Sequence, residues 1–481
     1  MLRWLLGGRD VQEPVEKSLV LCLGDDQPQN PYTQLQVLKG HSDIVRFMVW
    51  IDDTRFASAG DDGVVFIWNV QTGERLSELC GHSRPITGIA VIPLMYHLQP
   101  ESSCLLTASS DKTVIIWDLD TGSQIHLLAE FQSSVKCGGC HRKLKWEDLK
   151  CIRRGERERE KEREHKCLMV LERLEVWVSG ADRICVWTYN AELLCKTACF
   201  KDADVSLMIE LSKNNIVAAI RKELVIFKLV TSSESHTWEI TEMRRLSNHE
   251  DDIRALITIN DDTFATGSHV GELIIWDALD WTVKAFESQF WNAAPQYDKP
   301  AEIKISQTPN QSETCIHHLT SDRENIFAAI GTGIYVYNLQ MRTVIAYQQV
   351  AHDSRVLHIA KLPNNQLISC SVDGSVRLWV LQELPPAEPA TSGIFSMWGI
   401  GRPNKQQNQS KRKLECSVLK ILEITGDLIG HSGAVQMFLY SKEHGLVTCS
   451  TDHLIISWKN GQRESQLQSK ALFQKLEQDN V

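Results

Sequence analysis

"SCSVDGSVRLW", residues 369–379, combines a short apolar strand, a tight polar turn and a second apolar strand that ends in Trp379. A histidine in a short turn lies upstream, in "VAHDS" around His352. Four other stretches repeat this design with tryptophan at the same place: "SAGDDGVVFIW" (58–68), "TASSDKTVIIWD" (107–118), "TGSHVGELIIWD" (266–277) and "TCSTDHLIISW" (448–458). Such self-similarity indicates a repeat architecture.

Three weaker copies fill the gaps and bring the total to eight. They are "WVSGADRICVW", "VAAIRKELVIF" and "FAAIGTGIYVY", which end in Trp187, Phe227 and Tyr337. The pattern resembles the WD40 family, in which each repeat of about 40 to 45 residues forms one four-stranded blade. The resemblance implies an all-β fold, an eight-bladed WD40 β-propeller with long inserted loops, and we expect a C-terminal helix after the last blade.

Each complete copy contains four polar residues that suit a buried hydrogen-bond chain. In the first copy the Trp68 indole N–H can donate to Ser58, whose hydroxyl can donate to His41, and the other imidazole nitrogen faces Asp62. Such a chain stabilises a fold only if every member is satisfied. The same spacing gives three more sets: His82, Thr107, Asp111 and Trp117; His352, Ser369, Asp373 and Trp379; His431, Thr448, Asp452 and Trp458.

The remaining copies are incomplete. The fifth keeps His249, Thr266 and Trp276 but has Val270 in place of the aspartate, so we expect its turn to be held less tightly. The third, fourth and sixth lack the set. A Ser, His and Asp in contact also suggest a catalytic triad. Because one protein has little use for four identical active sites and each set includes a tryptophan, we interpret the sets as structural networks and predict no catalytic residue.

The repeats place the propeller at residues 31–463, between an N-terminal tail at 1–30 and a C-terminal amphipathic helix at 464–481. "PYTQLQVL", residues 31–38, is predicted to form the fourth strand of the last blade, so that the N-terminus closes the ring and protects its edges. Three insertions interrupt the repeats, at 138–166, 286–312 and 382–425.

The first insertion is rich in alternating Arg, Glu and Lys, which is typical of a solvated or disordered segment and leaves the integrity of the third blade in question. A zinc site could be drawn from Cys and His residues in and beside it, but only its CxxC has a standard spacing. "CGGCH" also matches the c-type haem attachment pattern, without an export signal or a second ligand. We predict no metal and no cofactor from these residues: Cys137, Cys140, His141, Cys151, His165 and Cys167.

The third insertion carries an apolar island inside a polar loop. Burying five such side chains contributes about 8 to 15 kcal/mol, whereas ordering a dozen backbone residues costs about 12 to 24 kcal/mol, so the segment cannot fold by itself. It either packs on the ring or engages a partner protein or a membrane, for which the neighbouring basic residues are suited. The island and the first basic residue after it are Ile394, Phe395, Met397, Trp398, Ile400 and Arg402.

The C-terminal stretch "ESQLQSKALFQKLEQ" has apolar residues at helical spacing. Packing of this helix on the ring and docking to a partner are both open. The apolar face consists of Leu467, Ala471, Leu472 and Leu476.

The composition excludes several function classes. A formal net charge of −10 argues against binding to a nucleic-acid backbone. No apolar stretch is long enough to span a bilayer, and the N-terminus is too short in its apolar part for a signal peptide, so a cytoplasmic protein is expected. The 14 Cys are scattered singly and are expected to be reduced.

A closer resemblance, to one branch of the WD40 family, covers nearly the whole chain outside residues 138–166. It is carried by "RFASAGDDG", "SHVGELIIWDALDW", "QLISCSVDGSVRLW", "GIFSMWGIGR" and "GDLIGHS". This resemblance implies a non-catalytic adaptor in a lysosome-associated complex with two longin/DENN-domain proteins, which regulates small GTPases and autophagy. It also implies that a cationic amino-acid transporter of the lysosomal membrane recognises the 382–425 loop and recruits the protein there.

Two other functions compete with this interpretation. A substrate receptor of a cullin ubiquitin ligase is the alternative binding role, but such receptors usually carry a basic residue shortly after the Trp–Asp pair, and "WDLD" and "WDAL" do not. A propeller hydrolase would require a polar cluster around the central channel, which the repeats do not supply. No small-molecule substrate is expected.

Overall fold

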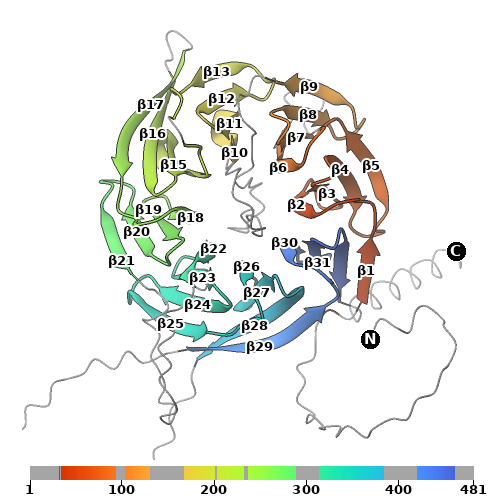
Figure 1. The fold of residues 1–481 in the computed structure, drawn as a ribbon, viewed down its shortest axis with the longest axis vertical. Coiled ribbons are helices and arrows are strands. Elements are labelled where there is room, and N and C mark those ends of the chain that lie inside the picture. Colours follow the sequence, from red (N-terminus) through yellow and green to blue (C-terminus); the bar gives the residue numbers. More distant parts are fainter. Residues whose placement is uncertain are drawn as a thin grey trace, which may run out of the picture.

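The computed structural model describes residues 32, 34–93, 103–129, 167–200, 203–231, 237–288, 314–383 and 420–460. These residues form eight antiparallel four-stranded sheets, which surround a central axis as the blades of a ring (Figure 1). The predicted eight-bladed propeller is therefore confirmed. The tail predicted at 1–30 and the helix predicted at 464–481 lie outside the described residues.

Blades are numbered here in chain order, and their strands are given from the axis outward. Blade 1 contains β2 (Val45–Trp50), β3 (Arg55–Gly60), β4 (Val64–Asn69) and β5 (Arg75–Cys80), and blade 2 contains β6 (Ile86–Pro93), β7 (Ser103–Ser109), β8 (Val114–Asp118) and β9 (Gln124–Leu128). Blade 3 contains β10 (Cys167–Leu171), β11 (Val176–Gly180), β12 (Ile184–Thr188) and β13 (Leu193–Lys196), and blade 4 contains β14 (Leu207–Leu211), β15 (Asn215–Ile220), β16 (Glu223–Thr231) and β17 (Trp238–Leu246).

Blade 5 contains β18 (Ile253–Asn260), β19 (Thr263–Ser268), β20 (Leu273–Asp277) and β21 (Val283–Glu287), and blade 6 contains β22 (Ile316–Ser321), β23 (Asn325–Ile330), β24 (Gly333–Asn338) and β25 (Thr343–Gln348). Blade 7 contains β26 (Val356–Lys361), β27 (Gln366–Ser371), β28 (Ser375–Glu383) and β29 (Lys420–Ile429), and blade 8 contains β30 (Val435–Ser441), β31 (Gly445–Ser450), β32 (Ile455–Lys459) and β1 (Gln34–Leu38). Two 3₁₀ turns, Glu172–Leu174 and Ser212–Asn214, join the first two strands of blades 3 and 4.

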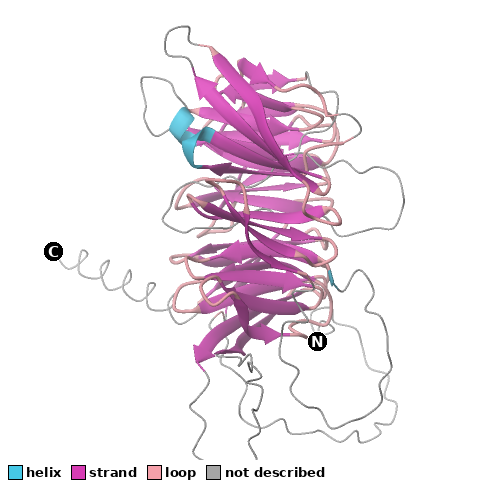
Figure 2. Ribbon diagram, turned by 90° about the vertical axis from the view of Figure 1, so that its left-hand side faces the viewer, coloured by secondary structure: helices cyan, strands magenta, loops and turns pink. Residues whose placement is uncertain are grey.

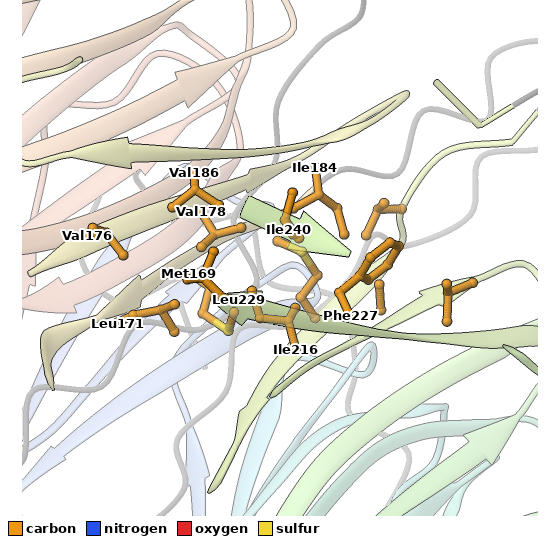
Figure 3. Close-up of a cluster of buried hydrophobic side chains, with 14 of the residues drawn as sticks. Met169, Leu171, Val176, Val178, Ile184, Val186, Ile216, Phe227, Leu229 and Ile240 are labelled. Atoms are coloured by element: carbon orange, nitrogen blue, oxygen red, sulfur yellow. The ribbon is translucent and has the colours of Figure 1, made fainter. Parts of the chain in front are cut away.

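The core lies between neighbouring blades, because each sheet packs on the sheets beside it. Second and third strands are therefore apolar on both sides, and β11 and β15 are buried at every position. Figure 3 shows one such contact, in which Met169 and Val178 of blade 3 pack with Ile216 and Phe227 of blade 4. Outer strands such as β5 expose most of their side chains to solvent.

The ring closes between the two ends of the chain. β1 pairs antiparallel with β32 along its whole length, so the N-terminal strand completes blade 8 as predicted (Figure 1). Two side chains also tie blade 8 to blade 1: Lys459 Nζ donates to the Gln71 carbonyl at 2.6 Å, and Gln36 Nε2 donates to the Thr72 carbonyl at 2.5 Å. The closure removes the exposed sheet edges that an open ring would have.

The two faces of the ring carry different connections. Figure 2 shows the ring edge-on, with most strands running across its thickness. Because consecutive strands are antiparallel, links between blades and turns between second and third strands share one face, which we call the histidine face because it carries His41 and Asp62. The opposite, hairpin face carries the other turns, the start of β1 and the end of β32.

Blades 4 and 7 have long outer hairpins. β28 and β29 contain 9 and 10 residues, and β16 and β17 contain 9 each. β28 continues to Glu383 and β29 starts at Lys420, so both ends of the range predicted as the 382–425 insertion are strand. The predicted 286–312 insertion likewise begins within β21, which ends at Glu287. Residues 289–312, 384–419 and 138–166 lie outside the described residues, whereas all four strands of blade 3 are in place.

Candidate functional site

The histidine face contains the side-chain networks expected from the repeats. In blade 1, His41 Nδ1 lies 2.9 Å from Asp62 Oδ2 and His41 Nε2 lies 2.8 Å from Ser58 Oγ. The Trp68 indole N–H donates to the same hydroxyl at 2.8 Å. Asp62 also accepts from the backbone N–H groups of Ser42 and Val64. The network thus fastens the turn that enters the blade to the turn between its second and third strands.

Blades 2 and 8 repeat this geometry. His431 Nδ1 lies 3.0 Å from Asp452 Oδ2, His431 Nε2 lies 2.8 Å from Thr448 Oγ1, and Trp458 Nε1 donates to that hydroxyl at 2.9 Å. The corresponding contacts in blade 2, at 3.0, 2.8 and 2.8 Å, join His82, Asp111, Thr107 and Trp117.

Blade 7 uses an additional hydroxyl that the spacing did not indicate. His352 Nε2 lies 2.7 Å from Ser369 Oγ, which also accepts from Trp379 Nε1 at 2.9 Å. On the other side of the imidazole, His352 Nδ1 lies 2.9 Å from Ser375 Oγ and 3.3 Å from Asp373 Oδ2. The Ser375 hydroxyl donates to Asp373 at 2.7 Å and therefore links the imidazole to the carboxylate.

Blade 5 has a complete network, contrary to the expectation that Val270 would leave its turn loosely held. Glu272 supplies the carboxylate: its Oε2 lies 2.9 Å from His249 Nδ1 and accepts from the Glu250 N–H at 3.1 Å. His249 Nε2 lies 2.6 Å from Thr266 Oγ1, to which Trp276 Nε1 donates at 2.9 Å. The longer Glu side chain reaches the imidazole from two residues further along the turn, where blade 7 has Ser375.

The carboxylates of these networks are stabilised in their ionised form. Burial alone raises the pKa of Asp452, but the bond to His431, the imidazole's charge and two backbone N–H groups lower it to about 2. The same combination around His41 holds the pKa of Asp62 below its usual range. In blade 5 burial lowers the pKa of His249, although Glu272 opposes this effect.

The buried position of the networks limits what they can do chemically. The hydroxyls of Ser58 and Ser369 belong to residues that are 0% exposed, and each already bonds an imidazole and an indole. A nucleophile must reach its substrate, and these hydroxyls face neighbouring side chains instead. The networks hold the turn that enters each blade against the turn between its second and third strands.

The other three blades have no network of this kind among their described residues, and aromatic side chains make stacking contacts or single hydrogen bonds there. In blade 3, Trp177 and Trp187 stack with centroids 5.3 Å apart, and Trp187 Nε1 donates to Ser179 Oγ at 3.0 Å. In blade 6, the Tyr337 hydroxyl donates to Glu287 of blade 5 at 3.3 Å. In blade 4, Phe227 of β16 contacts Phe200 with centroids 6.1 Å apart.

The predicted binding loop leaves the ring from the hairpin face of blade 7. Its base is the end of the β28–β29 ladder, where Glu383 pairs with Lys420. The island itself, Ile394, Phe395, Met397, Trp398, Ile400 and Arg402, lies outside the described residues, as do Leu467, Ala471, Leu472 and Leu476 of the predicted helix. Of the residues drawn into a zinc site, Cys167 begins β10 and the others lie outside the described ranges.

Within the described part of the chain, no group of three or more His, Cys, Asp or Glu side chains is arranged to hold a metal ion. No helix within the same ranges is long and apolar enough to cross a membrane.

Comparisons with known proteins extend the similarity over the whole chain. The WDR41 β-propeller family model matches residues 1–151 and 152–468. WD repeat-containing protein 41 of Homo sapiens is 53% identical over 484 residues, covering 100% of this chain and 98% of that protein. The Mus musculus protein of the same name is 51% identical with the same coverage. Among solved structures, the computationally designed Ika8 protein superposes with a TM-score of 0.57 at 15% identity, covering 88% of this chain and 98% of that chain; it supports the fold alone.

Proposed function

The chain belongs to the WDR41 β-propeller family, and from this premise we propose that it is a non-catalytic scaffold in a lysosome-associated complex with two longin/DENN-domain proteins. In this role it regulates small GTPases and autophagy through its partners. The 382–425 segment recruits the cytoplasmic complex to lysosomes by binding a transporter of that membrane. The segment's apolar island, at residues 394–400, supplies the contact.

The observation that carries this proposal is the long outer hairpin of blade 7. The ladder continues from Trp379, the last network residue, for four more pairs to Glu383 and Lys420. The Leu381 N–H donates to the Asn365 carbonyl at 3.1 Å, which ties the hairpin to the neighbouring turn of its own blade. Gln382 Nε2 bonds Glu423 Oε2 across the strands at 2.6 Å. The residues that follow Glu383 therefore start from a fixed base.

One side of this hairpin rests on the adjacent blade. Leu381, Leu422 and Ile424 pack against a buried cluster that includes Phe327 and Ile345 of blade 6. Burial of these apolar side chains holds the hairpin against the ring. A rigid base reduces the conformational entropy that an attached binding segment loses on association, so it favours presentation of a recognition segment.

The test separates recruitment from assembly. Cells express the full chain with Phe395→Ala and Trp398→Ala, and recruitment to lysosomes is scored beside co-purification with the DENN-domain proteins. Loss of two aromatic anchors costs about 4 kcal/mol, on the order of a thousandfold in affinity, so recruitment is expected to fail while assembly persists.

The matched control removes two exposed apolar side chains elsewhere on the rim. Leu279 and Phe286 of blade 5 are 59% and 48% exposed, and Leu279→Ala with Phe286→Ala should leave recruitment intact. Equal recruitment of the loop variant and the control would exclude the loop. Co-purification with a cullin ligase adaptor in place of DENN-domain proteins would favour the alternative function, a ubiquitin-ligase substrate receptor.

The C-terminal segment has a separate test. Deletion of residues 464–481 should weaken assembly with the DENN-domain proteins, because the apolar face of the predicted helix is assigned to that contact. The affinity of the loop for the transporter should stay unchanged. Undiminished co-purification of the truncated chain with both DENN-domain proteins would reject that assignment.

A further inference from the structure

An exposed serine follows two arginines where the chain passes from blade 4 to blade 5. The stretch "RRLS", residues 244–247, covers the end of β17, which stops at Leu246, and the first residue of the linker to β18. Arg244, Arg245 and Ser247 are exposed, whereas Leu246 is buried. Protein kinases select substrates by charge pattern, and two arginines at the third and second positions before a serine suit an enzyme with an acidic groove.

The residues before the serine lie on the outer edge of blade 4. In the described sheet β17 is the outermost strand, so one of its edges faces away from β16. Arg244 Nη1 donates to the Asp280 carbonyl at 3.0 Å, and Arg245 Nε donates to Glu242 Oε1 at 2.6 Å. Both contacts are exposed, and such charged contacts contribute little to stability because water and salt compete with them. An enzyme can therefore bind these arginines at small cost.

The serine hydroxyl is held by one carboxylate, with cations close by. Ser247 Oγ donates to Glu223 Oε1 at 3.1 Å, and Glu223 Oε2 lies 3.5 Å from Arg245 Nη1. Arg221 and Lys222 form the exposed turn that leads into Glu223 at the start of β16. A phosphate on this serine would lose the hydrogen bond to Glu223 and be repelled by it, but the Arg245 guanidinium could pair with it.

The residues after the serine are less accessible. They include an acidic run, residues 250–252, of the kind that acid-directed kinases read. However, His249 is only 4% exposed and is held in the blade 5 network, and the Glu250 N–H donates to Glu272 of the same network at 3.1 Å. The acidic run therefore starts from a fixed turn, whereas the arginines lie on an open edge. This difference favours an enzyme that reads the arginines.

We propose that Ser247 is a phosphorylation site for an arginine-directed serine kinase. The acidic groove of the kinase binds Arg244 and Arg245, and the Ser247 hydroxyl oxygen attacks the γ-phosphorus of ATP. A bond forms between Oγ and this phosphorus, and the bond from the phosphorus to the oxygen bridging to the β-phosphate breaks. The hydroxyl proton passes to a base of the kinase, and ADP leaves.

The phosphate changes the charge of the linker between blades 4 and 5. It adds about −1.5 to −2 charges at neutral pH, two residues before His249. Arg245 exchanges Glu223 for the phosphate, because a guanidinium pairs with phosphate oxygens through two parallel hydrogen bonds. Together with the acidic run at 250–252, the modified serine gives this part of the rim a concentrated negative charge.

The experiment uses the intact, folded full-length chain. The protein is incubated with ATP and the catalytic subunit of the cyclic-AMP-dependent protein kinase, and each phosphorylated peptide is quantified over time by mass spectrometry. Ser247 should be modified at least about tenfold faster than Ser77, which has one arginine before it and lies within the paired strand β5. Absence of phosphate on Ser247 in the folded chain would overturn the proposal, even if a synthetic peptide of residues 241–251 is modified.

Variants then test recognition of the two arginines. Arg244→Gln and Arg245→Gln should each slow phosphorylation of Ser247 about tenfold, because each removes one charged contact with the kinase. Arg173→Gln is the matched control, since this arginine of blade 3 has a 59% exposed side chain, and it should leave the rate unchanged. Unchanged rates in both arginine variants would contradict the proposal, and so would phosphorylation of Ser247 by casein kinase 2 alone, which reads acidic residues.

Discussion

Two halves of the same ring are held together in different ways. Blades 7, 8, 1 and 2 are contiguous, include the place where β1 meets β32, and each carry a histidine, a hydroxyl, an aspartate and a tryptophan in contact. Blades 3 to 6 contain one network among their described residues, in blade 5, and there a glutamate replaces the aspartate. Elsewhere in that half aromatic and aliphatic clusters are joined by single hydrogen bonds, such as those from Trp187 to Ser179 and from Tyr337 to Glu287.

The difference follows the covalent continuity of the chain. Blades 3 to 6 are each built from one continuous stretch of chain, and their neighbours pack through apolar clusters. At the seam, where the two ends of the chain meet, the ring depends on a five-residue strand pair, two side-chain bonds and an apolar cluster shared by blades 8 and 1. Networks that fix the turns on either side limit the opening of this joint, since a satisfied buried network is geometrically specific. We interpret the clustering of networks as reinforcement of the closure.

The largest effect should come from breaking a network beside the seam. His431→Ala in blade 8 leaves Asp452 buried without its imidazole and removes a partner of Thr448. Removing one member of a buried pair costs about 3 to 5 kcal/mol, which should lower the urea midpoint clearly. His453→Asn is the matched control: its side chain is 45% exposed, and Asn tolerates its positive φ of 67°. Equal midpoints for the two variants would contradict the role assigned to the network.

The sequence predicts most of this half and less of the other. Tryptophan, hydroxyl, histidine and aspartate recur at fixed spacing in four blades, and because spacing in a repeat fixes position in the blade, the fold and the contacts follow from it. The spacing did not predict the role of Glu272, because this residue lies two positions after the expected aspartate. Its longer side chain nevertheless reaches His249. The sequence placed the ends of β28 and β29 inside an insertion, because Pro-rich and Lys-rich residues adjoin them. In the structure these strand ends are paired, and nearby strand residues pack on blade 6.

Blade 5 provides the next test, with a smaller effect. Glu272→Gln keeps the side-chain length but removes the charge that faces His249, which should cost about 1 to 3 kcal/mol. Combining Val270→Asp with Glu272→Thr recreates the arrangement of blade 2, where Asp111 and Thr113 both contact the imidazole. The double variant should regain most of the lost stability in urea unfolding. Failure to regain it would mean that Glu272 acts by something other than its contact with His249.

The two halves can also be compared through one substitution made in each. Ser179→Ala in blade 3 removes one acceptor, that of Trp187 Nε1, and should cost about 1 kcal/mol because the stacked Trp177 remains. Ser369→Ala in blade 7 leaves both His352 Nε2 and the Trp379 indole without this partner and should cost about twice as much. Thermal midpoints measured side by side decide the matter, and an equal loss in both variants would remove the distinction between the halves.

The smallest expected effect concerns pH. On acidification, blade 5 is expected to lose stability before blade 8 does. Burial lowers the pKa of His249 below its ordinary value of about 6.5, so on acidification the unfolded chain takes up this proton before the folded chain does. Stability is therefore lost through blade 5 as pH falls below about 6.5. The pKa of Asp452, at about 2 in the fold against about 3.9 when unfolded, makes its contribution persist until pH falls below about 4. Urea midpoints at pH 7, 5.5 and 4.5 should thus decline in the unmodified chain and decline less in His249→Gln. An identical decline in both would show that this imidazole does not take up the proton responsible, and the difference between the halves would then be one of geometry alone.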